Sequence, residues 1–75
     1  MPQTVEFTFH TTAGEIVRGH RFINPDDTVG GWVADSAVIA PGSFVELDAI
    51  VGPSAEVGPG RIVRNGTFLQ EGEKY

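Results

Sequence analysis

The chain has 75 residues and a formal net charge of −5, with five Lys and Arg against ten Asp and Glu. Such a composition argues against nucleic acid or an anionic membrane as partner, because binding to either depends on Lys and Arg contacts with phosphates. One domain of this size buries only about 60% of its unfolded surface, and without cysteine it has no disulfide to add stability. Self-association is therefore the first expectation.

The sequence shows no targeting or membrane segment. No stretch approaches the roughly eighteen apolar residues of a transmembrane span. Residues 1–19 also lack the basic and apolar regions of a signal peptide. We therefore expect a soluble protein that is synthesised in the cytoplasm.

Residues 1–28 are predicted to form a β-hairpin and a linker. Apolar and polar residues alternate over residues 5–10, which is typical of a half-buried strand, and residues 16–23 can form its antiparallel partner. Asn24-Pro25-Asp26-Asp27 has the composition of a turn. The apolar face of the first strand consists of Val5, Phe7 and Phe9.

From residue 33 onward an aliphatic residue returns at every sixth position. A period of six fits neither a helix nor simple strand alternation, but it fits a chain that makes a short extended run, turns a corner and repeats. Pairs such as Pro41-Gly42 and Asn65-Gly66 suit tight turns at these corners. The fifth residue of most blocks is small, and Arg61 departs from this pattern. The seven aliphatic positions are Val33, Ile39, Val45, Val51, Val57, Val63 and Leu69.

This pattern, seen best in Val51-Gly52-Pro53-Ser54-Ala55, resembles the hexapeptide-repeat family of left-handed parallel β-helices. The resemblance covers residues 33–75 and implies three hexads per coil, so that residues eighteen apart are stacked. Seven hexads then make about 2.3 coils. We predict an all-β fold with an N-terminal β-hairpin and linker at residues 1–28, followed by a short left-handed parallel β-helix at residues 29–75.

Two outer faces of such a coil are predicted to be apolar. The residue before each repeated aliphatic points outward, because side chains alternate along a strand. The outward columns are Trp32, Ile50 and Phe68 on one face, Phe44 and Ile62 on a second, and Val38, Glu56 and Lys74 on the third. Contiguous apolar patches usually mark an interface, so the first two columns are the predicted contact between subunits. Two different patches in contact close into a ring, and the resemblance implies a homotrimer.

Stacking also predicts charge pairs and leaves the role of the hairpin open. Glu46 should lie beside Arg64 and Glu56 beside Lys74, with opposite charges in register. Arg61 departs from the family pattern and is expected to point outward to an acidic neighbour. The hairpin either caps one open end of the coil or reaches out as a docking arm, and the polar C-terminal tail is expected to blunt the other end.

The sequence offers no convincing catalytic, cofactor or metal site. The resemblance implies acyltransferases that use a histidine base or carbonic anhydrases with three zinc-binding histidines, but the repeats contain no histidine. His10 and His20 lie outside them and are interpreted as surface residues rather than metal ligands. Asp26, Asp27 and Asp48 are interpreted as turn residues rather than calcium ligands. Gly30 and Gly31 are interpreted as turn residues rather than a phosphate loop. Trp32 is interpreted as an interface anchor rather than a platform for sugar binding.

We therefore predict a non-enzymatic assembly protein. Gly30-Gly31-Trp32-Val33 resembles the opening of β-helical repeats in phage and prophage-encoded proteins, which implies a virion role such as a capsid cement protein or a spike tip. A larger assembly such as a viral capsid would then be the partner. The alternative is a minimal or degenerate acyltransferase-like enzyme with His10 or His20 as base.

Overall fold

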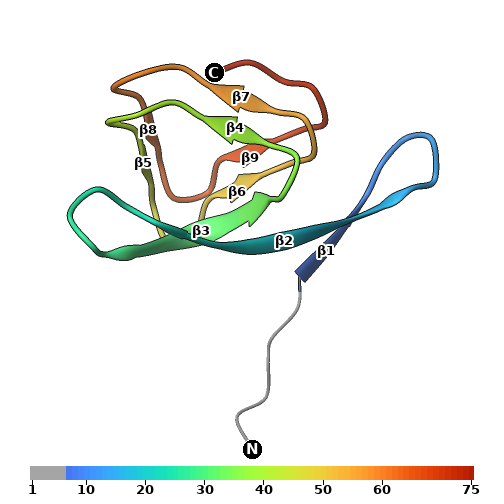
Figure 1. Cartoon of the computed structure of the whole chain (residues 1–75), viewed down its shortest axis with the longest axis horizontal. Coiled ribbons are helices and arrows are strands. Elements are labelled where there is room, and N and C mark those ends of the chain that lie inside the picture. Colours follow the sequence, from blue (N-terminus) through green and yellow to red (C-terminus); the bar gives the residue numbers. More distant parts are fainter. Residues whose placement is uncertain (1–6) are drawn as a thin grey trace, which may run out of the picture.

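The computed structural model describes residues 7–75, which form an all-β structure without any helix (Figure 1). The three longer strands come first and six two-residue strands follow. The strands are β1 Phe7–His10, β2 Ile16–Ile23, β3 Val29–Ala34, β4 Val38–Ile39, β5 Phe44–Val45, β6 Ile50–Val51, β7 Glu56–Val57, β8 Ile62–Val63 and β9 Phe68–Leu69.

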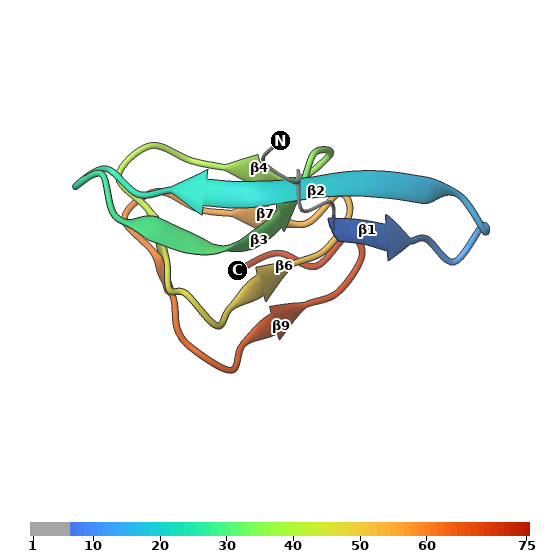
Figure 2. The ribbon, with the colours of Figure 1, turned by 90° about the horizontal axis from the view of Figure 1, so that it is seen from below.

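The predicted hairpin is confirmed over the described residues, whereas Val5 lies outside them. β1 and β2 are antiparallel, with Phe9 opposite Val17. β2 also pairs with β3, so the hairpin and the repeats share one five-stranded sheet in the order β1-β2-β3-β6-β9. This sheet is curled, and the hairpin projects to one side of the repeats (Figure 2). The pairing of β2 with β3 crosses the predicted boundary at residue 28, and the division into residues 1–28 and 29–75 stays a prediction.

Residues eighteen apart lie side by side, as predicted, in all three sheets that the described residues form. The chain passes from the five-stranded sheet to the β4-β7 sheet, then to the β5-β8 sheet, and returns. All of these contacts between repeats are parallel. The paired residues are Val33 with Val51, Val51 with Leu69, Ile39 with Val57, and Val45 with Val63.

The repeated aliphatic residues form the core. Six of the seven are at most 2% exposed, and Ile39 is partly buried. Ala49 and Ala55, at the fifth position of their blocks, are fully buried at inside corners where a larger side chain would not fit. Arg61 points outward as predicted, but its guanidinium lies 5.6 Å from the ring centre of Tyr75 and not beside an acidic residue.

One of the two predicted charge pairs forms. Lys74 Nζ lies 3.9 Å from Glu56 Oε2, and the two residues are bridged through their backbones. Because both side chains are exposed, the pair adds less than about 1 kcal/mol. The predicted contact of Glu46 with Arg64 is wrong: Glu46 Oε1 instead accepts the backbone N–H of Asn65 at 2.8 Å.

β3 lies close against the backbone around the corner between β5 and β6. A Cβ atom on Gly31 would come within 1.8 Å of the carbonyl oxygen of Ala49, and one on Gly30 within 2.2 Å of that of Val45. Both distances are far below van der Waals contact with backbone that has little freedom to move. Gly30 and Gly31 are therefore required for close approach, and the turn role predicted for them is wrong, because both lie within strand β3.

Asn24 takes the place of a neighbouring strand for β5. β5 pairs with β8 on one side only. On the other side the Asn24 side chain accepts the N–H of Val45 through Oδ1 at 2.8 Å and donates to its carbonyl through Nδ2 at 3.1 Å. Asn24 is only 7% exposed, so these bonds satisfy backbone groups that water reaches poorly. Together with β2 on β3, this contact acts as a cap on the repeats.

Replacement of Gly31 by Ala is expected to destabilise the fold by about 2 kcal/mol or more, because the added methyl group overlaps the Ala49 carbonyl. Urea unfolding followed by circular dichroism measures the change. Gly58→Ala is the matched control, since its Cβ atom would meet nothing closer than 3.5 Å. Equal stability of the Gly31→Ala and Gly58→Ala variants would contradict the close approach.

Asn24→Ala is expected to cost about 2–4 kcal/mol of unfolding free energy, because it leaves both backbone groups of Val45 without their partner. Asn65→Ala is the comparison. Its Oδ1 accepts the Asp48 N–H at 2.9 Å in an exposed setting, where water replaces the lost bond. Chemical denaturation should therefore show a clearly larger loss for Asn24→Ala, and a smaller loss there would argue against its capping role.

Candidate functional site

The predicted outward columns lie in register on the surface. Trp32 pairs with Ile50 and Ile50 with Phe68 in the five-stranded sheet. Phe44 pairs with Ile62 in the β5-β8 sheet. Phe68 is 57% exposed and Ile62 is 43% exposed, while the other three residues are half-buried. The structure thus brings the five predicted interface residues into two aligned columns.

The hairpin covers the beginning of the first column. The Phe7 ring stacks on Trp32 with centroids 5.1 Å apart and an interplanar angle of 18°. The guanidinium of Arg21 lies 4.6 Å from the Trp32 ring centre, and its Nη1 donates to the Gly30 carbonyl at 3.3 Å. Trp32 is therefore held within its own subunit, and Ile50 and Phe68 carry the more accessible part of this column. The only sequence signal for the contact of Phe7 with Trp32 was the alternation of apolar and polar residues over residues 5–10, which places Phe7 on an apolar face.

The second column belongs to a wider apolar surface that sequence reasoning missed in part. A groove of about 460 Å³ is lined by the linker before β3, by the β5-β8 sheet and by the corner after β5. Two exposed side chains extend the column here, Val29 at 52% and Leu47 at 55%. We call this surface the Leu47 patch, which consists of Val29, Phe44, Leu47 and Ile62. Leu47 occupies a corner position, where the repeat pattern predicts turns and gives no sign of an apolar patch.

Asp26 at the edge of this groove organises the turn before β3. Its Oδ1 accepts the hydroxyl of Thr28 at 2.6 Å and the Thr28 N–H at 3.2 Å. The hydroxyl bond and then the backbone bond lower the pKa of the Asp26 carboxyl below its usual range, so it is ionised at neutral pH. Over residues 7–75, no group of three or more His, Cys, Asp or Glu side chains is placed to hold a metal ion.

The two histidines do not meet. His10 is opposite Ile16 in the hairpin, four residues along β2 from His20, which corresponds to about 13 Å. His20 Nδ1 instead lies 2.6 Å from Asp35 Oδ1, with both side chains 55% exposed. A carboxylate at one ring nitrogen orients the imidazole and leaves the other nitrogen for proton transfer. However, neither His20 nor Asp35 lines the groove at the Leu47 patch or the groove between β1 and the repeats.

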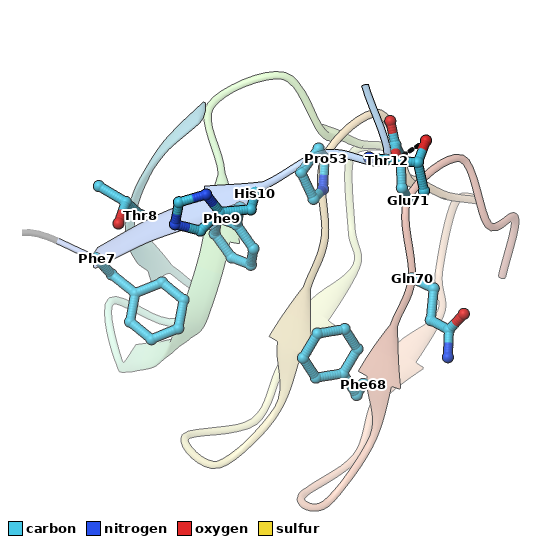
Figure 3. A pocket seen from close by; sticks show the side chains of 9 residues that line it. All are labelled: Phe7, Thr8, Phe9, His10, Thr12, Pro53, Phe68, Gln70 and Glu71. Carbon is cyan, nitrogen blue, oxygen red and sulfur yellow. Dashed lines mark hydrogen bonds between the residues drawn. The ribbon is translucent and has the colours of Figure 1, made fainter. Parts of the chain in front are cut away.

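A second groove, of about 580 Å³, runs between β1 and the repeats (Figure 3). Phe7 and Phe68 are on opposite sides of it, and Pro53 lies between their strands. At one end the loop after β1 is tied to the corner after β9, because the Thr12 N–H and hydroxyl both donate to Glu71 Oε1, at 2.9 and 3.0 Å. These residues are 59 positions apart, and no feature of the repeat predicts the contact.

The described residues include no helix long and apolar enough to cross a lipid bilayer. Comparisons of the chain with protein-family models, with curated proteins and with solved structures give no match. The function is therefore argued from the surfaces themselves.

Proposed function

We propose that this chain is a non-enzymatic assembly module that forms a homotrimer through two apolar outer faces. The observation that carries the proposal is the alignment of apolar side chains on two neighbouring sheets, Ile50 with Phe68 and Phe44 with Ile62. Contiguous apolar surface of this kind on a small protein usually marks an interface. Burial between copies would also supply stability that a 75-residue core provides only marginally.

The proposed architecture is a left-handed parallel β-helix of about 2.3 coils, preceded by a hairpin that caps its first coil. The constant register of eighteen residues in three sheets supports it, as does the common core of repeated aliphatic residues. The handedness rests on the resemblance to hexapeptide repeats.

The proposed trimer axis runs beside the corner that contains Leu47. Residues 46–49 connect β5 to β6, so the Leu47 patch and the Ile50–Phe68 column border one another at this corner. Three copies arranged with this corner inward place the Leu47 patch of each against the Ile50–Phe68 column of the next. A contact between unlike patches closes into a ring when the rotation permits, and in the proposed ring of three copies both apolar columns are covered. The third sheet, with Glu56 and Lys74 in its outer column, faces outward in this arrangement.

The larger structure that such a trimer would decorate is proposed from the resemblance of residues 30–33 to phage-type β-helical proteins. On this proposal the module is a capsid cement protein or a spike tip. A trimer with a charged outer sheet and a protruding hairpin fits a role in which one surface holds the copies together and another contacts the particle.

Leu47→Asp is expected to dissociate the assembly, because it would bring three carboxylates together at the axis in a desolvated position. The mass in solution, measured by light scattering after gel filtration, should be 24 kDa for the native chain, three times 8.0 kDa, and 8.0 kDa for the variant.

Val38→Asp is the matched control, since Val38 is 58% exposed and Leu47 is 55% exposed, but Val38 lies on the proposed outer face. Its mass should stay at that of the native chain. A monomeric native protein, or equal dissociation by both variants, would be incompatible with the proposed axis.

The alternative of an acyltransferase-like enzyme has one observation in its favour, the short contact of His20 with Asp35. Because this pair is exposed and lines none of the described grooves, we expect acetyl-CoA to leave the thermal unfolding midpoint unchanged. An increase in the midpoint that is lost in His20→Ala would favour the enzyme over the assembly module.

A further inference from the structure

The groove beside β1 runs along the edge of that strand and not across one of its faces. All four residues of β1 line it (Figure 3). Successive side chains of a strand point to opposite faces, so a groove on one face would be lined by alternate residues only. The groove therefore follows the edge that β1 turns away from β2, and β1 is the end strand of its sheet.

The backbone along this edge offers donors and acceptors to an incoming strand. The Arg18 carbonyl accepts the Asp35 N–H at 2.7 Å, so the backbone groups of Arg18 point toward β3 and away from β1. Thr8, which is opposite Arg18, is then in a non-hydrogen-bonded pair, and its own N–H and carbonyl point outward into the groove. The same alternation turns the backbone groups of His10 outward.

The opposite wall supplies apolar surface and negative charge. Phe68, 57% exposed, lies across the groove from Phe7. At the end of the groove near the loop after β1, the Glu71 carboxylate accepts both Thr12 bonds through one oxygen, and none of the residues that line the groove is a Lys or Arg. An apolar side chain followed by a basic one would thus find complementary surroundings along this path.

We propose that β1 binds an extended segment of a partner protein, which adds to the sheet as a further strand. Only an extended chain matches outward backbone groups that recur at every second residue, and side chains at alternate positions then fill the adjacent apolar groove. Four residues of β1 span about 13 Å, so the segment is short. It carries an apolar residue over Phe7 and Phe68 and a Lys or Arg beside Glu71.

The partner is a different protein and not a second copy of this chain. The remaining end strands of the described sheets, which belong to the repeats, have two residues each and are too short to cover β1. β1 itself carries no Lys or Arg to place beside Glu71. The groove shares no lining residue with the groove at the Leu47 patch, and it shares Phe68 with the Ile50–Phe68 column of the proposed trimer interface.

Thr8→Pro is the decisive variant, because proline removes the outward N–H without touching the hydrogen bonds between β1 and β2. The probe is a displayed library of random linear peptides, selected on the native protein. We expect the selected peptides to alternate apolar residues and to carry a Lys or Arg next to one of them. Their affinity should fall by about tenfold or more in Thr8→Pro, which loses one hydrogen bond and crowds the edge, and stay within about twofold in Thr8→Ala, which keeps the N–H.

Further measurements keep the result interpretable. Circular dichroism and the amide resonances of Phe7 and Phe9 should show an intact hairpin in Thr8→Pro, and the mass in solution should equal that of the native chain. Selection of no peptide, or equal binding to Thr8→Pro and Thr8→Ala, would overturn the proposal. A drop in mass for Thr8→Pro would also overturn it, since a second copy would then occupy the groove. Peptide binding that survives in Leu47→Asp separates this proposal from the trimer.

Discussion

Backbone hydrogen bonding between segments eighteen residues apart is the constraint on which this structure depends. Each strand of the repeats after β3 has only two residues, so one sheet alone would contribute few bonds. The same register in three sheets makes the bonds support one another around a common core, as when the Val38 N–H donates to Ala55 and the Ala40 N–H to Val57. The period of six follows from the passage of the chain through three sheets in turn. In each sheet the chain needs one inward aliphatic residue and then a corner that leads to the next sheet. Shifting any side by one residue would turn its aliphatic residue outward.

A ladder of this kind must be ended, and the described part of the chain ends it differently in different sheets. β2 continues the five-stranded sheet beyond β3, whereas the single side chain of Asn24 bonds the free side of the β5-β8 sheet at Val45. One amide is sufficient there because a strand of two residues turns only one residue's backbone groups toward that side. Gly30 and Gly31 allow the chain to pass between these two caps without a clash. β2 therefore covers the edge of β3, while β1 is the end strand of the sheet that the described residues form.

The repeat could be predicted from the sequence because its physical cause is local and recurs seven times. Each hexad has an inward aliphatic residue, most have turn residues and a small corner residue, and the stacking of Val33, Val51 and Leu69 follows. The contacts that the sequence did not predict occur once each and join residues outside any period. Phe7 on Trp32, Asn24 on Val45 and Thr12 on Glu71 are separated by 25, 21 and 59 positions. Alternation places Phe7 on an apolar face, but no pattern identifies its partner or marks the other two pairs. Glu46 was assigned to Arg64 because register alone does not account for the backbone N–H of Asn65.

The same distinction separates the two candidate surfaces. The apolar columns are a product of the repeat, since outward residues at a fixed position stack whenever the register holds, and Phe44 with Ile62 forms as soon as β5 meets β8. The groove beside β1 is a product of contacts that occur once: Phe7 stacks on Trp32, and Glu71 bonds Thr12 in the loop after β1. A surface built by stacking is wide and apolar and suits another copy with the same repeat. A surface built by a strand edge offers directed backbone groups and suits a segment that need share nothing with this chain except an extended conformation. Self-association and attachment to a different protein therefore share Phe68 and otherwise depend on different contacts.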